Sequence, residues 1–95
     1  MTRPAAEATS MLEDERVRVT RYDFAPDAET GWHRHEMDYV ITTLTPCTML
    51  LEEPGGGSRT VTFAAGEVYR REEGVEHNVV NAGTEPMAFI EVELK

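Results

Sequence analysis

The sequence has little cysteine and little aromatic content: Cys47 is the one cysteine, and Phe, Trp and Tyr make up 7% of the residues. One cysteine cannot form a disulfide within the chain, whereas small domains of oxidising compartments often depend on several. We therefore expect a reducing, cytoplasmic location. Cys47 stands at the start of a predicted strand, where we expect it to be buried as a small hydrophobic residue.

Positive charge is also scarce: the chain has nine Lys and Arg residues and 18 Asp and Glu residues, which gives a formal net charge of −9. This charge repels phosphate backbones and predicts that nucleic acid is not a partner. No apolar run approaches the roughly 20 residues that a membrane-spanning helix needs. The acidic start of the chain also lacks the layout of a secretory signal. We expect no membrane partner.

With 95 residues the chain is too short for two hydrophobic cores, so we expect one domain. Residues 5–15 contain good helix formers but show weak apolar periodicity. We predict an N-terminal arm or short helix over residues 1–14 and a folded domain over residues 15–95.

From residue 15 onward the chain consists of short segments, rich in β-branched and apolar residues, that turn residues separate. This pattern is typical of an all-β sandwich or barrel. The sequence predicts about seven strands, at residues 16–24, 39–44, 48–53, 59–63, 67–71, 77–81 and 87–94. The run Pro54-Gly55-Gly56-Gly57-Ser58 can take positive φ angles without steric cost and predicts a hairpin.

The three histidines are the most informative feature. His33 and His35 are separated by one residue, which on an extended strand places both imidazoles on the same face. There they can share a metal ion at about 2.0–2.1 Å. An H-x-H pair alone is weak support, because two histidines on a strand are more often a polar edge.

The segment from Gly66 to Asn81 adds specific support, because it resembles the second conserved motif of the cupin family. Gly66, Gly74, His77 and Asn81 fall at the family's positions, and Glu72 replaces the motif's proline. The segment around His33 and His35 resembles the first cupin motif only in its H-x-H core. Asp38 stands one residue before the motif's glutamate position.

The resemblance implies a double-stranded β-helix, a jelly-roll-like barrel whose interior holds one divalent transition metal (Fe, Mn, Ni or Zn). His33, His35 and His77 match the family's ligands. The fourth position has two candidates. Asp38 can reach inward if the strand bulges, giving a site of three histidines and one carboxylate. Strand parity from His35 instead turns Tyr39 inward, which leaves three imidazoles and vacant positions for water or substrate.

Three further residues are candidates for the site. Tyr39 is a candidate catalytic acid or base if it lies within hydrogen-bond reach of substrate. Alternation from Tyr69 points Arg71 into the barrel, where a guanidinium needs an anionic partner, either an internal glutamate or a substrate carboxylate. Trp32 beside His33 is a candidate lid, dimer contact or substrate-stacking residue.

We therefore predict a metal-dependent enzyme, dioxygenase-like or of related chemistry, that acts on a small carboxylate-bearing molecule. Short cupins of this kind are similar to proteins assigned to the breakdown of small acids and β-alanine. A cupin that binds or senses a small molecule without turnover is the alternative. A barrel that has lost its metal is disfavoured, because all three histidines are retained. Related cupins commonly form dimers, so we also expect a homodimer.

Overall fold

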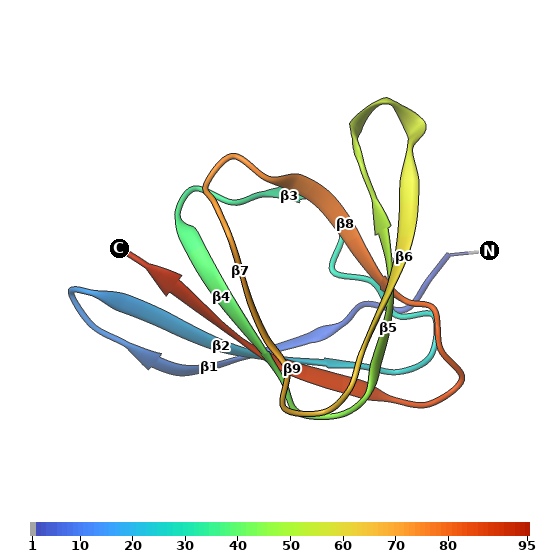
Figure 1. Ribbon diagram of the computed structural model, residues 1–95, viewed down its shortest axis with the longest axis horizontal. Helices are drawn as coiled ribbons and strands as arrows, with labels where there is room; N and C mark the ends of the chain where they lie inside the picture. Colours follow the sequence, from blue (N-terminus) through green and yellow to red (C-terminus); the bar gives the residue numbers. More distant parts are fainter. Residues whose placement is uncertain (1) are drawn as a thin grey trace.

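The computed structural model describes residues 2–95, which fold into two antiparallel sheets that form a barrel (Figure 1). These residues form nine strands and one turn of 3-10 helix: β1 (Glu7–Glu13), β2 (Val17–Phe24), β3 (His33–Arg34), β4 (Asp38–Thr43), β5 (Cys47–Glu52), η1 (Pro54–Gly56), β6 (Ser58–Phe63), β7 (Val68–Arg71), β8 (Glu76–Asn81) and β9 (Met87–Leu94). One sheet has the order β1-β2-β9-β4-β7 and the other β3-β8-β5-β6. The all-β prediction is confirmed.

Each of the seven predicted strands is present, with ends that differ from the prediction by at most one residue. The glycine-rich hairpin is also present between β5 and β6, which pair from Cys47↔Phe63 to Glu52↔Ser58. Gly55 and Gly56 have φ angles of 87° and 88° there. An L side chain rarely adopts that conformation, which is why glycine occupies both positions.

The N-terminal segment differs from the prediction, because residues 7–13 form strand β1 and not a helix. Residue 1 lies outside the described residues. β1 pairs antiparallel with β2 from Glu7↔Asp23 to Glu13↔Arg18, with a bulge between Ser10 and Leu12. Every residue of β1 is exposed, so the strand is an edge ribbon held by backbone hydrogen bonds to β2. Helix propensity alone favoured the other conformation, and pairing with β2 overrides it.

The interior is filled by side chains from both sheets and includes an aromatic cluster on β2 and β9. The ring of Phe89 on β9 lies 5.4 Å from that of Phe24 and 5.5 Å from that of Tyr22, both on β2. Cys47 is buried, at 1% exposure, as the sequence predicted. Tyr22 and Phe89 also line the small cavity beside His33 and His77, so the aromatic cluster borders the histidine site.

Asn81, the last residue of the second motif, is fully buried and its side chain holds neighbouring backbone segments in place. Its amide nitrogen donates to the carbonyl oxygens of Phe24, Ala25 and Glu85, and its Oδ1 accepts from Gly83 N at 3.0 Å. The side chain thus ties the end of β8 to the ends of β2 and β9. Among residues 2–95 no helix is long and apolar enough to cross a membrane.

Candidate metal centre

The three histidines meet at one end of the barrel. β3 pairs with β8 so that His33 lies directly opposite His77, and His35 follows β3 on the same face. His33 Nε2 lies 3.0 Å from His35 Nε2, and His35 Nε2 lies 3.1 Å from His77 Nε2. The ligand atoms of all three lie within 4.8 Å of one another. Residues that are 42 positions apart in the sequence thus form one cluster.

The spacing of these nitrogens fits a transition metal. Three imidazole nitrogens bound at about 2.0–2.1 Å, at angles between octahedral and tetrahedral, lie about 2.9–3.4 Å apart. The two measured separations, 3.0 and 3.1 Å, fall in that range. His35 and His77 are each only 6% exposed, so bulk water does not compete freely for them.

The protonation of His33 also suits a metal ligand. Its Nδ1 lies 2.9 Å from the carbonyl oxygen of Gly31, which can only accept a hydrogen bond. Nδ1 therefore carries the proton, and Nε2 presents a lone pair toward His35. A lone pair aimed at two other ring nitrogens is stabilised by a cation between them.

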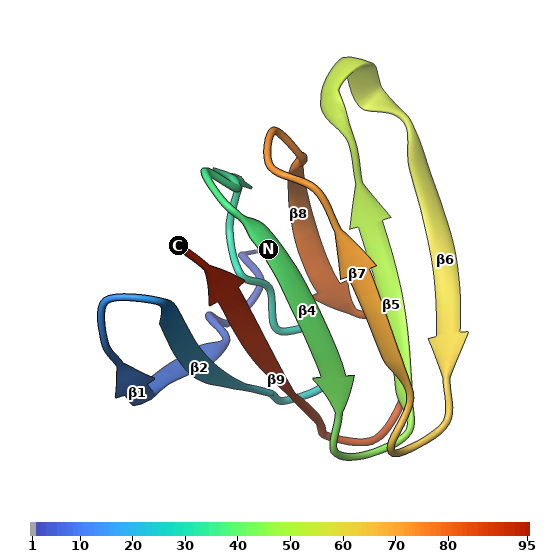
Figure 2. The ribbon, with the colours of Figure 1, turned by 60° about the vertical axis from the view of Figure 1, so that its left-hand side comes forward.

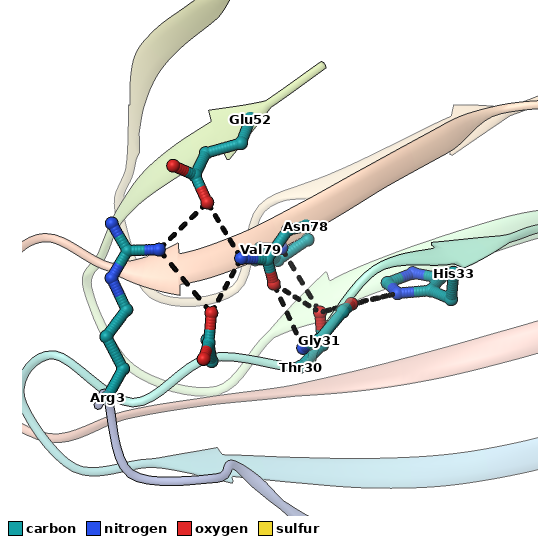
Figure 3. Close-up of polar contacts among 8 residues, drawn as sticks. Arg3, Thr30, Gly31, His33, Glu52, Asn78 and Val79 are labelled. Atoms are coloured by element: carbon teal, nitrogen blue, oxygen red, sulfur yellow. Dashed lines mark hydrogen bonds and ion pairs between the residues drawn. The ribbon is translucent and has the colours of Figure 1, made fainter. Parts of the chain in front are cut away.

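A network of polar side chains holds the loop before His33 in place (Figure 3). The buried Asn78 on β8 accepts a hydrogen bond from Gly31 N at 2.9 Å through Oδ1. Its amide nitrogen donates to Glu29 Oε1 at 2.7 Å and to Glu52 Oε1 at 2.8 Å. Arg3 bridges the same two carboxylates, at 3.4 and 2.8 Å. The N-terminal arm is thereby linked through Asn78 to the turn that orients His33.

Burial keeps two of the histidines neutral. Desolvation, followed by the charges of His33 and Arg71, lowers the pKa of His35 to about 4. The pKa of His77 is lowered to about 3, mainly by desolvation and further by the charges of His33, His35, Arg71 and Arg59. Neutral imidazole is the form that binds metal, so at neutral pH no proton has to leave either ring.

Tyr39 forms one wall of the site. Its ring stacks on His35 with centroids 3.8 Å apart and an interplanar angle of 18°. Its hydroxyl is buried and has no hydrogen-bond partner among residues 2–95. Burial is the main cause that raises the pKa of Tyr39 to about 12, so the hydroxyl stays protonated near neutral pH and can donate to a bound molecule.

Glu91 on β9 is a buried carboxyl beside the cluster that the sequence analysis missed. It is 6% exposed, and its Oε1 lies 3.9 Å from His35 Nδ1, beyond hydrogen-bond distance. Desolvation, with a contribution from Glu93, raises the pKa of Glu91 to about 7. A cavity of about 20 Å³, room for one water-sized group, lies among His33, His77, Tyr39 and Glu91. Glu91 shares a face of β9 with Phe89, which is the one sequence signal for its inward direction, but Ile90 and Val92 alternate in the same way on the opposite face.

The remaining predicted site residues lie in different surroundings. Asp38 does not join the three histidines: its Oδ1 accepts a hydrogen bond from Glu73 N at 2.9 Å. Arg71 on β7 lies directly opposite Tyr39 on β4, so both side chains are on the inner face, as alternation predicted. Trp32 is 57% exposed next to His33. Its role as a lid, dimer contact or stacking residue stays a prediction.

A β-barrel with three convergent histidines at one end could hold a metal ion, and comparison with known sequences identifies the family. The Cupin domain family matches residues 20–93, and the chain belongs to that family. The beta-alanine degradation protein BauB of Pseudomonas aeruginosa is 48% identical over 93 residues, which cover 98% of this chain and 97% of that one.

Solved structures support the same assignment. A cupin domain from Bordetella pertussis is 48% identical and superposes with a TM-score of 0.95, covering 100% of this chain and 98% of that one. A double-stranded β-helix protein from Klebsiella pneumoniae, 21% identical, has a TM-score of 0.78 and covers 95% of this chain and 76% of that one. The second likeness concerns the fold alone.

The tyrosines of this barrel give a prediction for alkaline pH. All three tyrosines of the chain, Tyr22, Tyr39 and Tyr69, have pKa values raised above 10, chiefly by burial. Above pH 10 the unfolded chain loses tyrosine protons that the folded chain keeps, so stability is fully present below pH 10 and falls as pH rises through about 12. Each tyrosine contributes up to about 1.4 kcal/mol per pH unit.

Tyrosinate absorbance and circular dichroism, followed together in a pH titration, check this expectation. The two signals should change in one cooperative step, because ionisation requires unfolding. Any tyrosine that ionises with a pKa near 10 while the circular dichroism stays native would contradict the assignment of that residue to the interior.

Proposed function

We propose that the chain is a metal-dependent enzyme that acts on a small carboxylate-bearing molecule bound between the histidine cluster and Arg71. The observation that supports it is that the inner face carries both a set of metal-ligand nitrogens and a guanidinium without a counter-charge. Three imidazole nitrogens converge with metal-like spacing, and the guanidinium of Arg71 has no ion pair or hydrogen bond with any of residues 2–95. A partly buried guanidinium without a counter-charge is costly unless an anion binds to it.

Each residue has a defined role in this proposal. His33, His35 and His77 would hold one divalent transition metal, which supplies Lewis acidity and vacant coordination positions when bound. The guanidinium of Arg71 binds the substrate carboxylate through two parallel hydrogen bonds and fixes its orientation. The protonated Tyr39 hydroxyl, which lacks an internal partner, donates a hydrogen bond to the bound molecule. The burial of His35, His77 and Tyr39 limits the access of bulk water to the metal side of the site.

The name of the Pseudomonas aeruginosa relative supports the substrate class, because β-alanine is itself a small carboxylic acid. A cupin that binds such an acid without turnover would use the same Arg71 contact. Turnover therefore has to be measured separately from binding. Self-association as a homodimer is part of the same proposal and is checked by sedimentation of the purified chain.

Protection against heat tests the Arg71 contact. Small mono- and dicarboxylates should raise the melting temperature of the metal-loaded protein, because a ligand of the folded state adds RT ln(1 + [L]/Kd), about 2.7 kcal/mol at a hundredfold excess over Kd. Arg71→Met keeps most of the side-chain bulk and should abolish the shift without lowering metal content. Arg16→Met, at an exposed arginine away from the site, is the matched control and should behave like wild type.

An equal response of wild type and Arg71→Met, or no response of either to any acid, would mean that Arg71 does not bind a substrate carboxylate. Protection by an acid that is never consumed, in protein loaded with each of Fe, Mn, Ni and Zn under air, would favour the non-catalytic alternative.

A further inference from the structure

A second cavity opens between strands β6 and β7. These strands are consecutive in the chain, but β6 is the edge of one sheet and β7 the edge of the other, so no ladder of hydrogen bonds joins them. Figure 2 shows the two strands diverging from the turn that connects them. The space between them is a cleft of about 360 Å³, lined by Leu51, Arg59, Val61, Phe63, Tyr69, Arg70 and Arg71.

The inner part of this β6–β7 cleft is apolar. Phe63 and Tyr69 stack with ring centroids 4.8 Å apart and an interplanar angle of 11°, which closes the cleft near the turn. Val61 lies opposite Met49 and Arg59 opposite Leu51 in the pairing of β6 with β5. Because inward-facing residues alternate along β6, Val61 lies between Arg59 and Phe63 on one face.

The open part of the cleft is positively charged. Three of the nine basic residues of this acidic chain, Arg59, Arg70 and Arg71, line it, and no Asp or Glu of residues 2–95 does. Within the same residues Arg70 and Arg71 have no ion-pair partner, and Arg59 has only Glu53 Oε1 at 3.6 Å, a contact in which both side chains are almost half exposed. Such an exposed pair contributes little and yields readily to a competing anion.

Arg59 and Arg71 lie at the end of the cleft nearest the metal centre. Arg71 is opposite Tyr39, whose ring covers His35, and Arg59 is opposite Leu51, which is itself opposite Val79 two residues beyond His77. An anion between the two guanidinium groups would therefore adjoin the histidine end of the barrel. A body attached to that anion would extend over Val61 toward the Phe63–Tyr69 stack.

We infer that the β6–β7 cleft binds an organic acid with an apolar aliphatic or aromatic body, whose carboxylate lies between Arg59 and Arg71 and whose body covers Leu51 and Val61. This inference rests on the proposed function for the role of Arg71 and adds the size class of the acid and a second arginine. The cleft is of ligand size and combines an apolar wall with a few charged groups, as small-molecule sites generally do.

The experiment is a calorimetric titration of the full chain, with and without metal, using acetate, propionate, hexanoate and benzoate as probes. Hexanoate and benzoate should bind at least tenfold more tightly than acetate in both forms of the protein, because the cleft is built without the metal. Arg59→Glu, at an exposed position, should weaken hexanoate binding at least tenfold. Arg16→Met should leave it unchanged.

A second variant, Val61→Trp, fills the cleft and should remove the preference for the larger acids while metal content stays at the wild-type value. Arg59→Glu keeps the test valid if the tryptophan variant does not fold. Equal affinity for acetate and hexanoate, or wild-type affinity in Arg59→Glu, would overturn the inference. If small acids then still protect the metal-loaded protein through Arg71, the proposed function stands without the cleft; if no acid binds at all, both are overturned.

Discussion

Protein purified without a histidine tag should contain about one equivalent of a divalent transition metal, and His77→Ala should contain almost none. The chain has three histidines, and all three ring nitrogens meet within 4.8 Å. Removing His77 leaves two ligands and a cavity in place of a buried ring, so affinity should fall well beyond the ten- to a hundredfold typical of changes to residues that only support ligands. Elemental analysis of both proteins measures the difference.

Asp38→Ala is the informative control for that experiment. The carboxylate of Asp38 accepts the hydrogen bond of Glu73 N and does not join the histidines, so this variant should keep its metal. A large loss of metal in Asp38→Ala would instead identify Asp38 as the fourth ligand, reached through a local bulge. Equal metal content in wild type and in a His33→Ala, His77→Ala double variant would contradict the whole assignment.

Asn78→Asp should destabilise the protein by about 3 kcal/mol at neutral pH and lower its metal affinity. The change replaces the amide that donates to Glu29 and Glu52 by a third carboxylate, at a position that is 1% exposed. Arg3 is then the one remaining donor to Glu29 and Glu52 within this network, and it faces three negative charges. For a domain of this size the melting temperature should fall by roughly 12–24 °C.

Two further variants separate the effect of the added negative charge from the effect of the lost hydrogen bonds. Asn78→Ala removes the same hydrogen bonds without adding a charge and should be less destabilising at neutral pH. Adding Glu52→Gln to Asn78→Asp returns a donor and removes one negative charge, so it should recover part of the loss. If Asn78→Asp melts like wild type at pH 7, the carboxylate pair is not held by Asn78.

Local patterns predicted most of the barrel and the three ligands. Alternation of apolar and polar residues identified β2, β4 and β9, and the spacing of Gly66, Gly74, His77 and Asn81 identified the family. These features are local, because strand alternation and turn glycines are imposed by backbone geometry within a few residues. β1 was missed because all of its residues are exposed, so no alternation of burial marks it.

The features that were missed in the site depend on contacts between distant segments. On β9 the apolar Ile90 and Val92 occupy one face and Phe89 and Glu91 the other, and pairing with β2 and β4 places the face with Glu91 inside the barrel. The network around Asn78 joins residues from position 3 to position 78, and each of them is an ordinary polar residue by itself. No local pattern distinguishes such residues from surface ones.

The pairing of β2 with β9 has a consequence for the order in which the barrel can assemble during synthesis. β2 lies between β1 and β9, and its eight residues pair with the last strand of the chain, from Val17↔Leu94 to Phe24↔Met87. A nascent chain emerging from a ribosome can form the β1–β2 and β5–β6 hairpins early, because both are local. β2 gains its second partner only after β9 has been synthesised, so the barrel closes late, in the slow regime of folding that distant strand pairing imposes.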